Sequence, residues 1–378
     1  MSKLHASSPD ATINSTLIII VVMITVSATV SYYAINYPSG TNAVSTTTAP
    51  AITTTSLTTS TSSSSATSNT ASIPLAWGAS VGYPTEVWAH SCITWGGFMY
   101  CVGGLIGGST VSNVTSAVYY APLSSSGAGQ WTRTTSYPVG IRSQSCVAGA
   151  GNIYCIGGYT NSTISNAVYF ASLSSSGVGQ WTSTTSYPAP VWTQSCVGST
   201  NGVYSSSGIY CVGGITPSNP ESRNVYYAPF SSSGLGQRTN TTSYPVGVRQ
   251  QSCAISSSDL YCVGGFSSTS VYYAPLTASG VGQWTNTTSY PFTGGVNSAS
   301  CVTPGSEIYC IGGFIHDSVY HATLSSSGVG QWTNSTNYPA SVWGESCAAS
   351  GTEIYCVGGN TASGSALINS VYYFEGNP

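Results

Sequence analysis

The chain repeats one short phrase six times: a tyrosine, a cysteine, an aliphatic residue and two glycines. The diglycines occupy positions 103–104, 157–158, 213–214, 264–265, 312–313 and 358–359. The units that contain them start at 77, 131, 181, 238, 284 and 332, so successive starts are 46 to 57 residues apart. Each unit holds four short β-rich runs between turn residues, and a period of this length is typical of propeller blades. We therefore predict an all-β fold, a six-bladed β-propeller over residues 73–378.

The two ends of the repeat array complement each other. The first unit opens on "IPLAWGASVGYP", which has the character of a fourth, outer strand, whereas the last unit stops after "SVYYFEG", a third strand. The last blade therefore lacks an outer strand of its own. We predict that residues 73–79 supply this strand and close the ring, which removes an exposed strand edge.

Each unit resembles a kelch repeat. In the second unit the resemblance rests on Tyr154, the diglycine 157–158, Tyr169 in the next strand and Trp181. The same pattern covers residues 77–378, and the resemblance implies a kelch-type propeller. The chain departs from the kelch pattern in two ways. Arg238 replaces the tryptophan that opens the fourth unit, and a cysteine stands in each second strand where the family usually has an aliphatic residue.

All twelve cysteines lie in the repeats, two per unit, with eight residues between them in five units and fourteen in the third. A two-residue turn midway between them, as at Gly96–Gly97, would place the two cysteines opposite each other as a non-hydrogen-bonded pair within reach of a disulfide. Buried free thiols, zinc ligation and catalytic thiols are the alternatives. We predict one disulfide in each blade: Cys92–Cys101, Cys146–Cys155, Cys196–Cys211, Cys253–Cys262, Cys301–Cys310 and Cys347–Cys356.

The first 72 residues differ in kind from the repeats. Residues 17–36 form an uncharged apolar run that is long enough to cross a bilayer, with Lys3 on its N-terminal side. We interpret this run as a transmembrane signal-anchor helix in the cell membrane, after a short cytoplasmic tail (1–16), with the propeller extracellular. A cleaved signal peptide is the alternative. Residues 37–72 are rich in Ser and Thr, which is typical of a disordered and often glycosylated stalk.

Charge is scarce throughout the chain. Only 4% of the residues are charged, the net charge is −3, and no lysine follows Lys3. This composition excludes the basic surface of a nucleic-acid-binding protein. We found no nucleotide, cofactor or metal motif, so we expect no cofactor. Solubility must depend on neutral polar residues and on glycans, for which the candidate acceptors are Asn113, Asn161, Asn240, Asn286 and Asn334.

The loops on one face of the predicted ring vary among the units, and this variation indicates where recognition takes place. Two positions on that face, four and two residues before the first cysteine of each unit, belong at the start of the innermost strand. Their aromatic, guanidinium and amide groups would form a two-tier ring suited to a glycan or protein ligand. The kelch resemblance offers a structural alternative, because an arginine at the first position usually packs between blades in that family. The candidate ligand-binding residues are Trp88, His90, Arg142, Gln144, Trp192, Gln194, Arg249, Gln251, Asn297, Trp343 and Glu345.

These observations favour a cell-surface binding or adhesion module without catalytic residues. The leading alternative is an exported hydrolase or lyase that acts on polysaccharide, and a structural protein of the cell envelope is a third reading. An enzyme would need paired acids or an arginine cluster, and the nine acidic residues of the chain form no paired motif.

Overall fold

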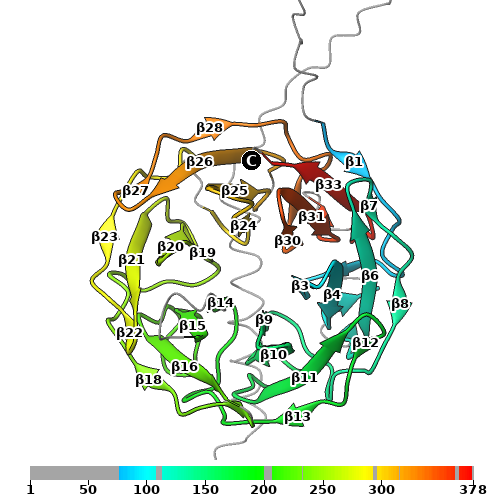
Figure 1. The fold of residues 1–378 in the computed structure, drawn as a ribbon, viewed down its shortest axis with the longest axis horizontal. Helices are drawn as coiled ribbons and strands as arrows, with labels where there is room; N and C mark the ends of the chain where they lie inside the picture. Colours follow the sequence, from blue (N-terminus) through cyan, green and yellow to red (C-terminus); the bar gives the residue numbers. More distant parts are fainter. Residues whose placement is uncertain are drawn as a thin grey trace, which may run out of the picture. The chain divides into compact units, whose positions relative to one another are not determined.

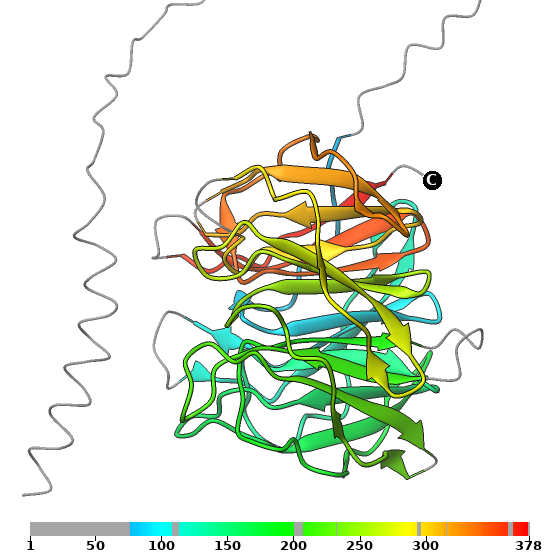
Figure 2. The same cartoon turned by 90° about the vertical axis from the view of Figure 1, so that its left-hand side faces the viewer.

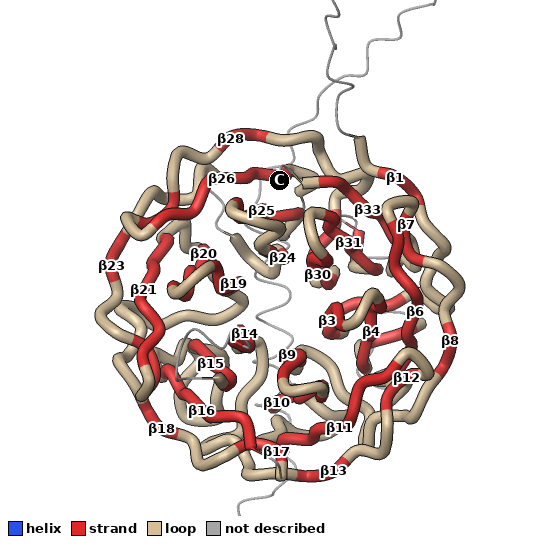
Figure 3. Tube along the Cα trace, viewed as in Figure 1, coloured by secondary structure: helices blue, strands red, loops and turns tan. Residues whose placement is uncertain are grey.

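The computed structural model describes residues 76–107, 113–199, 207–231, 233–292, 296–314, 316–361 and 366–376. The predicted tail (1–16), transmembrane helix (17–36) and stalk (37–72) lie outside these residues. The described residues include no helix that is both long and apolar enough to cross a membrane. They fold as an all-β six-bladed propeller, which confirms the predicted fold of the repeat array (Figures 1 and 3).

Each blade is an antiparallel sheet whose strands follow one another from the axis to the rim. Blade 1 consists of β3 (Ser91–Trp95), β4 (Phe98–Val102), β6 (Val118–Ser124), β7 (Gly127–Ala128) and β8 (Thr132–Arg133). Blade 2 consists of β9 (Ser145–Gly149), β10 (Asn152–Ile156), β11 (Val168–Ser174), β12 (Gly177–Val178) and β13 (Thr182–Ser183). Blade 3 consists of β14 (Ser195–Ser199), β15 (Gly208–Val212), β16 (Val225–Ser231), β17 (Gly234–Leu235) and β18 (Thr239–Asn240).

The remaining three blades repeat this plan, except that the last one borrows its outer strand. Blade 4 consists of β19 (Ser252–Ser256), β20 (Asp259–Val263), β21 (Val271–Thr277), β22 (Gly280–Val281) and β23 (Thr285–Asn286). Blade 5 consists of β24 (Ser300–Val302), β25 (Glu307–Ile311), β26 (Val319–Ser325), β27 (Gly328–Val329) and β28 (Thr333–Asn334). Blade 6 consists of β30 (Ser346–Ser350), β31 (Glu353–Val357), β33 (Val371–Glu375) and β1 (Gly78–Ala79). In the side view of Figure 2, the connections between strands gather at the two faces of the ring.

The diglycine follows each second strand and brings it close to the next blade. In blade 2, Gly157 and Gly158 have φ angles of +62° and +99°, in the left-handed region that glycine tolerates best. A side chain at Gly157 would collide with the carbonyl oxygen of Val191, in the connector that enters blade 3. The N–H of Gly158 donates to that same carbonyl at 2.8 Å. The repeated glycines therefore allow close contact between the backbones of neighbouring blades.

All six predicted disulfides are present, one in each blade. The paired cysteines stand directly opposite each other on the first and second strands, with Cα atoms 4.0–4.1 Å apart. This short separation is that of a non-hydrogen-bonded pair. In the third blade the longer spacing keeps the same register, and Cys196 faces Cys211. Because no cysteine is free, the alternatives of free, zinc-binding or catalytic thiols are wrong.

A serine joins the inner edge of each blade to the next blade. The residue before the first cysteine is serine in all six units, and its Oγ accepts the backbone N–H of the first cysteine in the following blade at 2.8–3.0 Å. In a non-hydrogen-bonded pair this N–H points away from the partner strand, so without the serine it would lie unpaired on an open edge. The six bonds form a closed ring, which we call the serine belt: Ser91, Ser145, Ser195, Ser252, Ser300 and Ser346.

The N-terminal segment closes the ring. β1 lies antiparallel to β33 at the position of an outer strand. This is the pairing predicted for residues 73–79, of which the structure describes 76–79. Trp77 donates its indole N–H to a carbonyl of the connector that enters blade 6, at 3.1 Å. The Oγ of Ser80 accepts the N–H of Ala128 in blade 1 at 2.6 Å, so the segment joins blade 6 to blade 1.

Arg238 fills the place of a tryptophan without loss of contacts. In blade 2, Trp181 donates its indole N–H to the preceding connector and meets Tyr137 edge-on, with ring centroids 4.9 Å apart. In blade 3, the guanidinium of Arg238 donates to two carbonyls of the corresponding connector and lies 5.6 Å from the ring centroid of Tyr187. The arginine thus supplies both the hydrogen bond and, as a cation–π pair, the aromatic contact.

We predict that alkylation of the denatured full-length protein without reductant adds no mass, because every sulfur is already paired. After reduction, alkylation is expected at all twelve cysteines. Intact-protein mass spectrometry measures both states. Adducts before reduction would contradict the disulfide pattern.

We also predict that Ser195→Ala lowers the free energy of unfolding by about 1–3 kcal/mol, because it leaves the inner-edge N–H of Cys253 without an acceptor. Ser175→Ala, at an exposed turn of blade 2, is the matched control and should change stability by less than about 0.5 kcal/mol. Guanidinium unfolding under non-reducing conditions compares the two variants. Equal stabilities would show that the serine belt contributes little.

Candidate functional site

Six residues stand just before the innermost strands, one per blade, and all are half-buried. Each lies beside the residue that follows the diglycine of its own blade. Trp88 is opposite Leu105 in the pair β2 (Val87–Trp88) and β5 (Leu105–Ile106), and Trp343 is opposite Asn360 in the pair β29 (Val342–Trp343) and β32 (Asn360–Thr361). These residues therefore lie next to the loops that vary among the units. We call them the mouth residues: Trp88, Arg142, Trp192, Arg249, Asn297 and Trp343.

Two mouth tryptophans and a phenylalanine pack together on one side of the mouth, over blades 5, 6 and 1. The rings of Trp88 and Trp343 meet edge-on with centroids 4.6 Å apart, and Phe314 lies 5.8 Å from Trp343. Gly344 makes room for this pair, because a Cβ there would lie 3.1 Å from the Trp88 ring. We call Trp88, Trp343 and Phe314 the aromatic half of the mouth.

Guanidinium groups occupy the opposite side, over blades 2 to 4. Arg142 lies over the rings of Tyr159 and Trp192, 4.9 and 5.4 Å from their centroids. Burial lowers the pKa of Arg142 below its usual value, although the group keeps its charge at physiological pH. Arg249 lies 3.9 Å from the centroid of Phe266 and pairs with Glu221, Nε to Oε1, at 3.5 Å. Both cations therefore have aromatic or acidic partners within the protein.

The residues two positions further on form a buried tier between the blades. The amides of Gln144, Gln194 and Gln251 donate to the last carbonyl of the second strand in the preceding blade, at 2.6–2.8 Å. The side chains of these glutamines tie blade 1 to 2, 2 to 3 and 3 to 4. The structure therefore places this predicted set between blades, close to the mouth residues in sequence but hardly exposed to solvent. The corresponding residues of the other blades are Ala299, Glu345 and His90.

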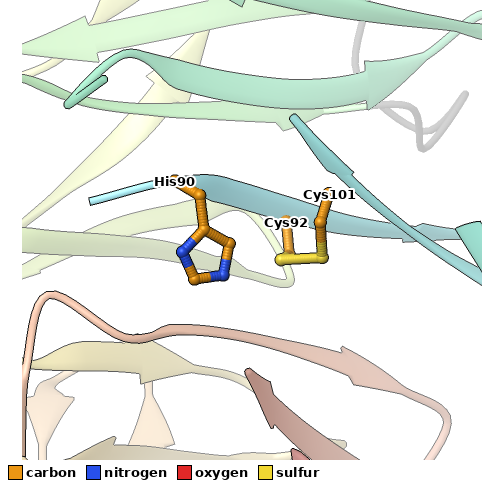
Figure 4. Close-up of side chains that lie close together, drawn as sticks. All are labelled: His90, Cys92 and Cys101. Atoms are coloured by element: carbon orange, nitrogen blue, oxygen red, sulfur yellow. A yellow bond between two sulfur atoms is a disulfide. The ribbon is translucent and has the colours of Figure 1, made fainter. Parts of the chain in front are cut away.

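His90 lies beside the disulfide Cys92–Cys101 (Figure 4). Because both sulfurs are joined to each other, the imidazole is the one ordinary metal ligand of this group. Burial lowers the pKa of His90 to about 3, so the ring is neutral at physiological pH. The ring stacks on Tyr83 with centroids 5.9 Å apart, which favours a packing role.

Glu345 occupies the place of a buried-tier glutamine. Its Oε1 approaches Gly312 of blade 5 just as the Nε2 of Gln144 approaches Gly103 of blade 1. A glutamine donates a hydrogen bond from this place, and a carboxyl group can do so only when protonated. Burial raises the pKa of Glu345 to about 8, a rise that the backbone N–H groups of Glu345 and Ser300 limit. Burial therefore favours the protonated, neutral form of Glu345 near neutral pH.

Sequence reasoning missed a second closed ring at the mouth. The residue between each mouth residue and the buried tier has a φ of +52° to +66°, and its N–H donates to the carbonyl of its counterpart in the preceding blade at 2.7–3.3 Å. The left-handed conformation costs a non-glycine residue about 1–2 kcal/mol, which the ring of bonds offsets. These residues share no side-chain type, so no sequence signal marked them. We call them the mouth belt: Ala89, Ser143, Thr193, Gln250, Ser298 and Gly344.

Several polar atoms near the mouth are buried and lack a hydrogen-bond partner among the described residues. Among the mouth residues and their neighbours they include the indole N–H groups of Trp88 and Trp192, the amide oxygens of Asn297 and Asn360, and the Nε atoms of Arg142 and Arg249. Buried polar atoms usually have partners, so these atoms, spread around the ring, make the mouth a candidate binding site. A ligand rich in hydroxyl or amide groups would satisfy them while it packs on the aromatic half. Asn360 and Phe314 each follow directly after a diglycine. The residue at this place varies among the units, so the sequence alone could have marked both as candidates.

One solved structure, titled "Structure of YjhT", resembles this chain over 77% of its length and 96% of the other chain, with a TM-score of 0.61 and 14% identity. At this identity the likeness shows the fold alone, a β-propeller. No family model matches the chain, and no curated protein matches it.

The buried Glu345 predicts a pH-dependent stability. Because its pKa is about 8 in the folded protein and about 4.5 when exposed, its contribution to stability is full below about pH 4.5 and is lost as the pH rises through 8. Glu345→Gln, which can donate at every pH, should match the wild type near pH 5 and exceed it at pH 9 by on the order of 4 kcal/mol. Unfolding curves at the two pH values measure the difference, with the exposed Glu86→Gln as control. The prediction is wrong if the stability difference between Glu345→Gln and the wild type is the same at pH 5 and pH 9, as it should be for Glu86→Gln.

Proposed function

We propose that this protein is an exported, membrane-anchored, kelch-like binding module that recognises a glycan or a protein at the cell surface through its mouth residues. The observation that carries the proposal is the mouth itself. There, half-buried aromatic and guanidinium groups stand beside buried polar atoms that lack partners among the described residues. Such a mixture of apolar surface and a few convergent polar groups is typical of ligand sites.

Export is supported by the six disulfides, since such bonds persist in oxidising compartments and are rare in the cytosol. The apolar run at 17–36 and the Ser/Thr-rich tract at 37–72 would then serve as anchor and stalk. A stalk of this length would hold the ring away from the membrane and leave its varied face free to meet a partner.

The division of the mouth favours an amphipathic ligand. A pyranose ring can place its C–H face on Trp88 or Trp343 and direct its hydroxyls toward the half-buried Asn297. A protein loop with exposed amides and an aromatic side chain could make the same contacts. Glycan recognition is the simpler reading, because the unpartnered atoms include both donors and acceptors, as hydroxyl groups require.

One observation favours a second candidate, an exported hydrolase or lyase that acts on polysaccharide. Glu345 is a buried acid whose pKa is raised to about 8, and enzymes use such groups as general acids. Its carboxyl group lies against blade 5, however, and is 6% exposed as a residue, which leaves little access for a substrate. The binding module is therefore the preferred function.

We predict graded losses of affinity when single mouth residues are removed. The full-length protein, purified in mild detergent, is screened on a glycan array, and the best ligand is titrated by calorimetry. Trp88→Ala, Trp192→Ala and Trp343→Ala should each weaken binding about 5- to 50-fold, because each removes about 1–2 kcal/mol of stacking.

The matched control is Trp284→Phe, at an indole that donates to the Thr242 carbonyl away from the mouth and should leave affinity unchanged. Loss of polysaccharide cleavage on Glu345→Gln would favour the enzyme instead. Equal affinities for all three mouth variants and the wild type would exclude this face as the binding site.

A further inference from the structure

Three glycosylation sequons fall on one structural position of three consecutive blades. Asn240, Asn286 and Asn334 are the second residues of the outer strands β18, β23 and β28, which lie on the rim in Figure 1. Each is exposed and stands opposite the tyrosine of the third strand. The equivalent residues in blades 6, 1 and 2 are Ala79, Arg133 and Ser183.

The outer strands form the open edges of the sheets. An open edge can pair with a strand of another molecule, and proteins usually prevent this with short strands and charged side chains, lysine above all. This chain keeps its outer strands to two residues but has no lysine beyond Lys3, and Arg133 is the one charge at the equivalent positions. At this position blades 3, 4 and 5 carry no charge, and each presents a sequon asparagine instead.

We propose that Asn240, Asn286 and Asn334 carry N-linked glycans that cover the outer edges of blades 3, 4 and 5 and leave those of blades 6, 1 and 2 bare. The proposal rests on the proposed export, which brings the chain to the glycosylation machinery. The donor is a lipid-linked oligosaccharide. The side-chain nitrogen of each asparagine bonds to the first sugar carbon and loses a proton, and the lipid phosphate or diphosphate leaves with the bonding electrons.

The hydroxyl groups of these sequons indicate when the transfer takes place. Thr242 and Thr288, two residues after Asn240 and Asn286, donate their hydroxyls to carbonyls of the next blade, at 2.8 and 2.7 Å. In the folded ring these hydroxyls are therefore engaged between blades. Because the sequon must present its hydroxyl to the transferase, modification precedes the docking of the next blade.

The first experiment reads occupancy directly. The full-length protein is produced in a secretory host that performs N-glycosylation, and glycan removal in heavy-oxygen water marks each modified asparagine for peptide mass spectrometry. We expect all three outer-strand asparagines to be modified in most molecules. An unmodified Asn240, Asn286 or Asn334 in the exported protein overturns the proposal, whatever the ligand-binding experiments show.

The second experiment tests the covering role. The triple variant N240Q/N286Q/N334Q should self-associate, with at least a two-fold higher mass by light scattering than the wild type at equal concentration. The double variant N113Q/N161Q is the matched control, since it removes two sequons from the loops of blades 1 and 2 and should keep the wild-type mass. A triple variant with the wild-type mass would overturn the covering role. If the triple variant fails to fold, the single variants decide the question in the same way.

Discussion

The innermost strand of each blade has one edge that its own sheet cannot satisfy, and the ring depends on how this edge is bonded. The disulfide fixes its two cysteines as a non-hydrogen-bonded pair, which turns the cysteine N–H toward the axis. The serine of the preceding blade accepts that N–H. A slip of one residue between the first two strands would misplace the disulfide and the serine belt together, since side chains alternate between the faces of a sheet. The disulfide and the serine belt therefore both require the same register between the first two strands of a blade.

The mouth belt shows why the side chains at the mouth can vary while the scaffold stays constant. Its six interblade hydrogen bonds use only backbone atoms, so they form whether the residue is Ala89, Thr193 or Gln250. The mouth residue just before each belt position is then free to be tryptophan, arginine or asparagine. A repeat array with this arrangement can change its ligand without changing its contacts between blades.

The sequence predicted contacts that lie within one blade and failed on contacts between blades. Blade number, the cysteine pairing and the outer strand in β1 all follow from spacing and count. The serine before each first cysteine was visible in six copies, but its partner belongs to another unit, so its role had no local signal. Gln144, Gln194 and Gln251 were predicted at the mouth beside the arginines, and their amides instead serve interblade carbonyls, which only the packed ring defines.

The departures from the buried-tier glutamine gather in one sector of the ring. The buried-tier glutamines join blades 1 to 2, 2 to 3 and 3 to 4. Ala299, Glu345 and His90 take their place at the boundaries between blades 4 and 5, 5 and 6, and 6 and 1. The same sector holds the closing strand β1 and the aromatic half of the mouth. Trp88 and Trp343 belong to blades 1 and 6, so a ligand that packs on both rings bridges the boundary that the N-terminal segment closes. By linkage, such a ligand would stabilise the whole folded ring, including this boundary, which has no buried-tier glutamine.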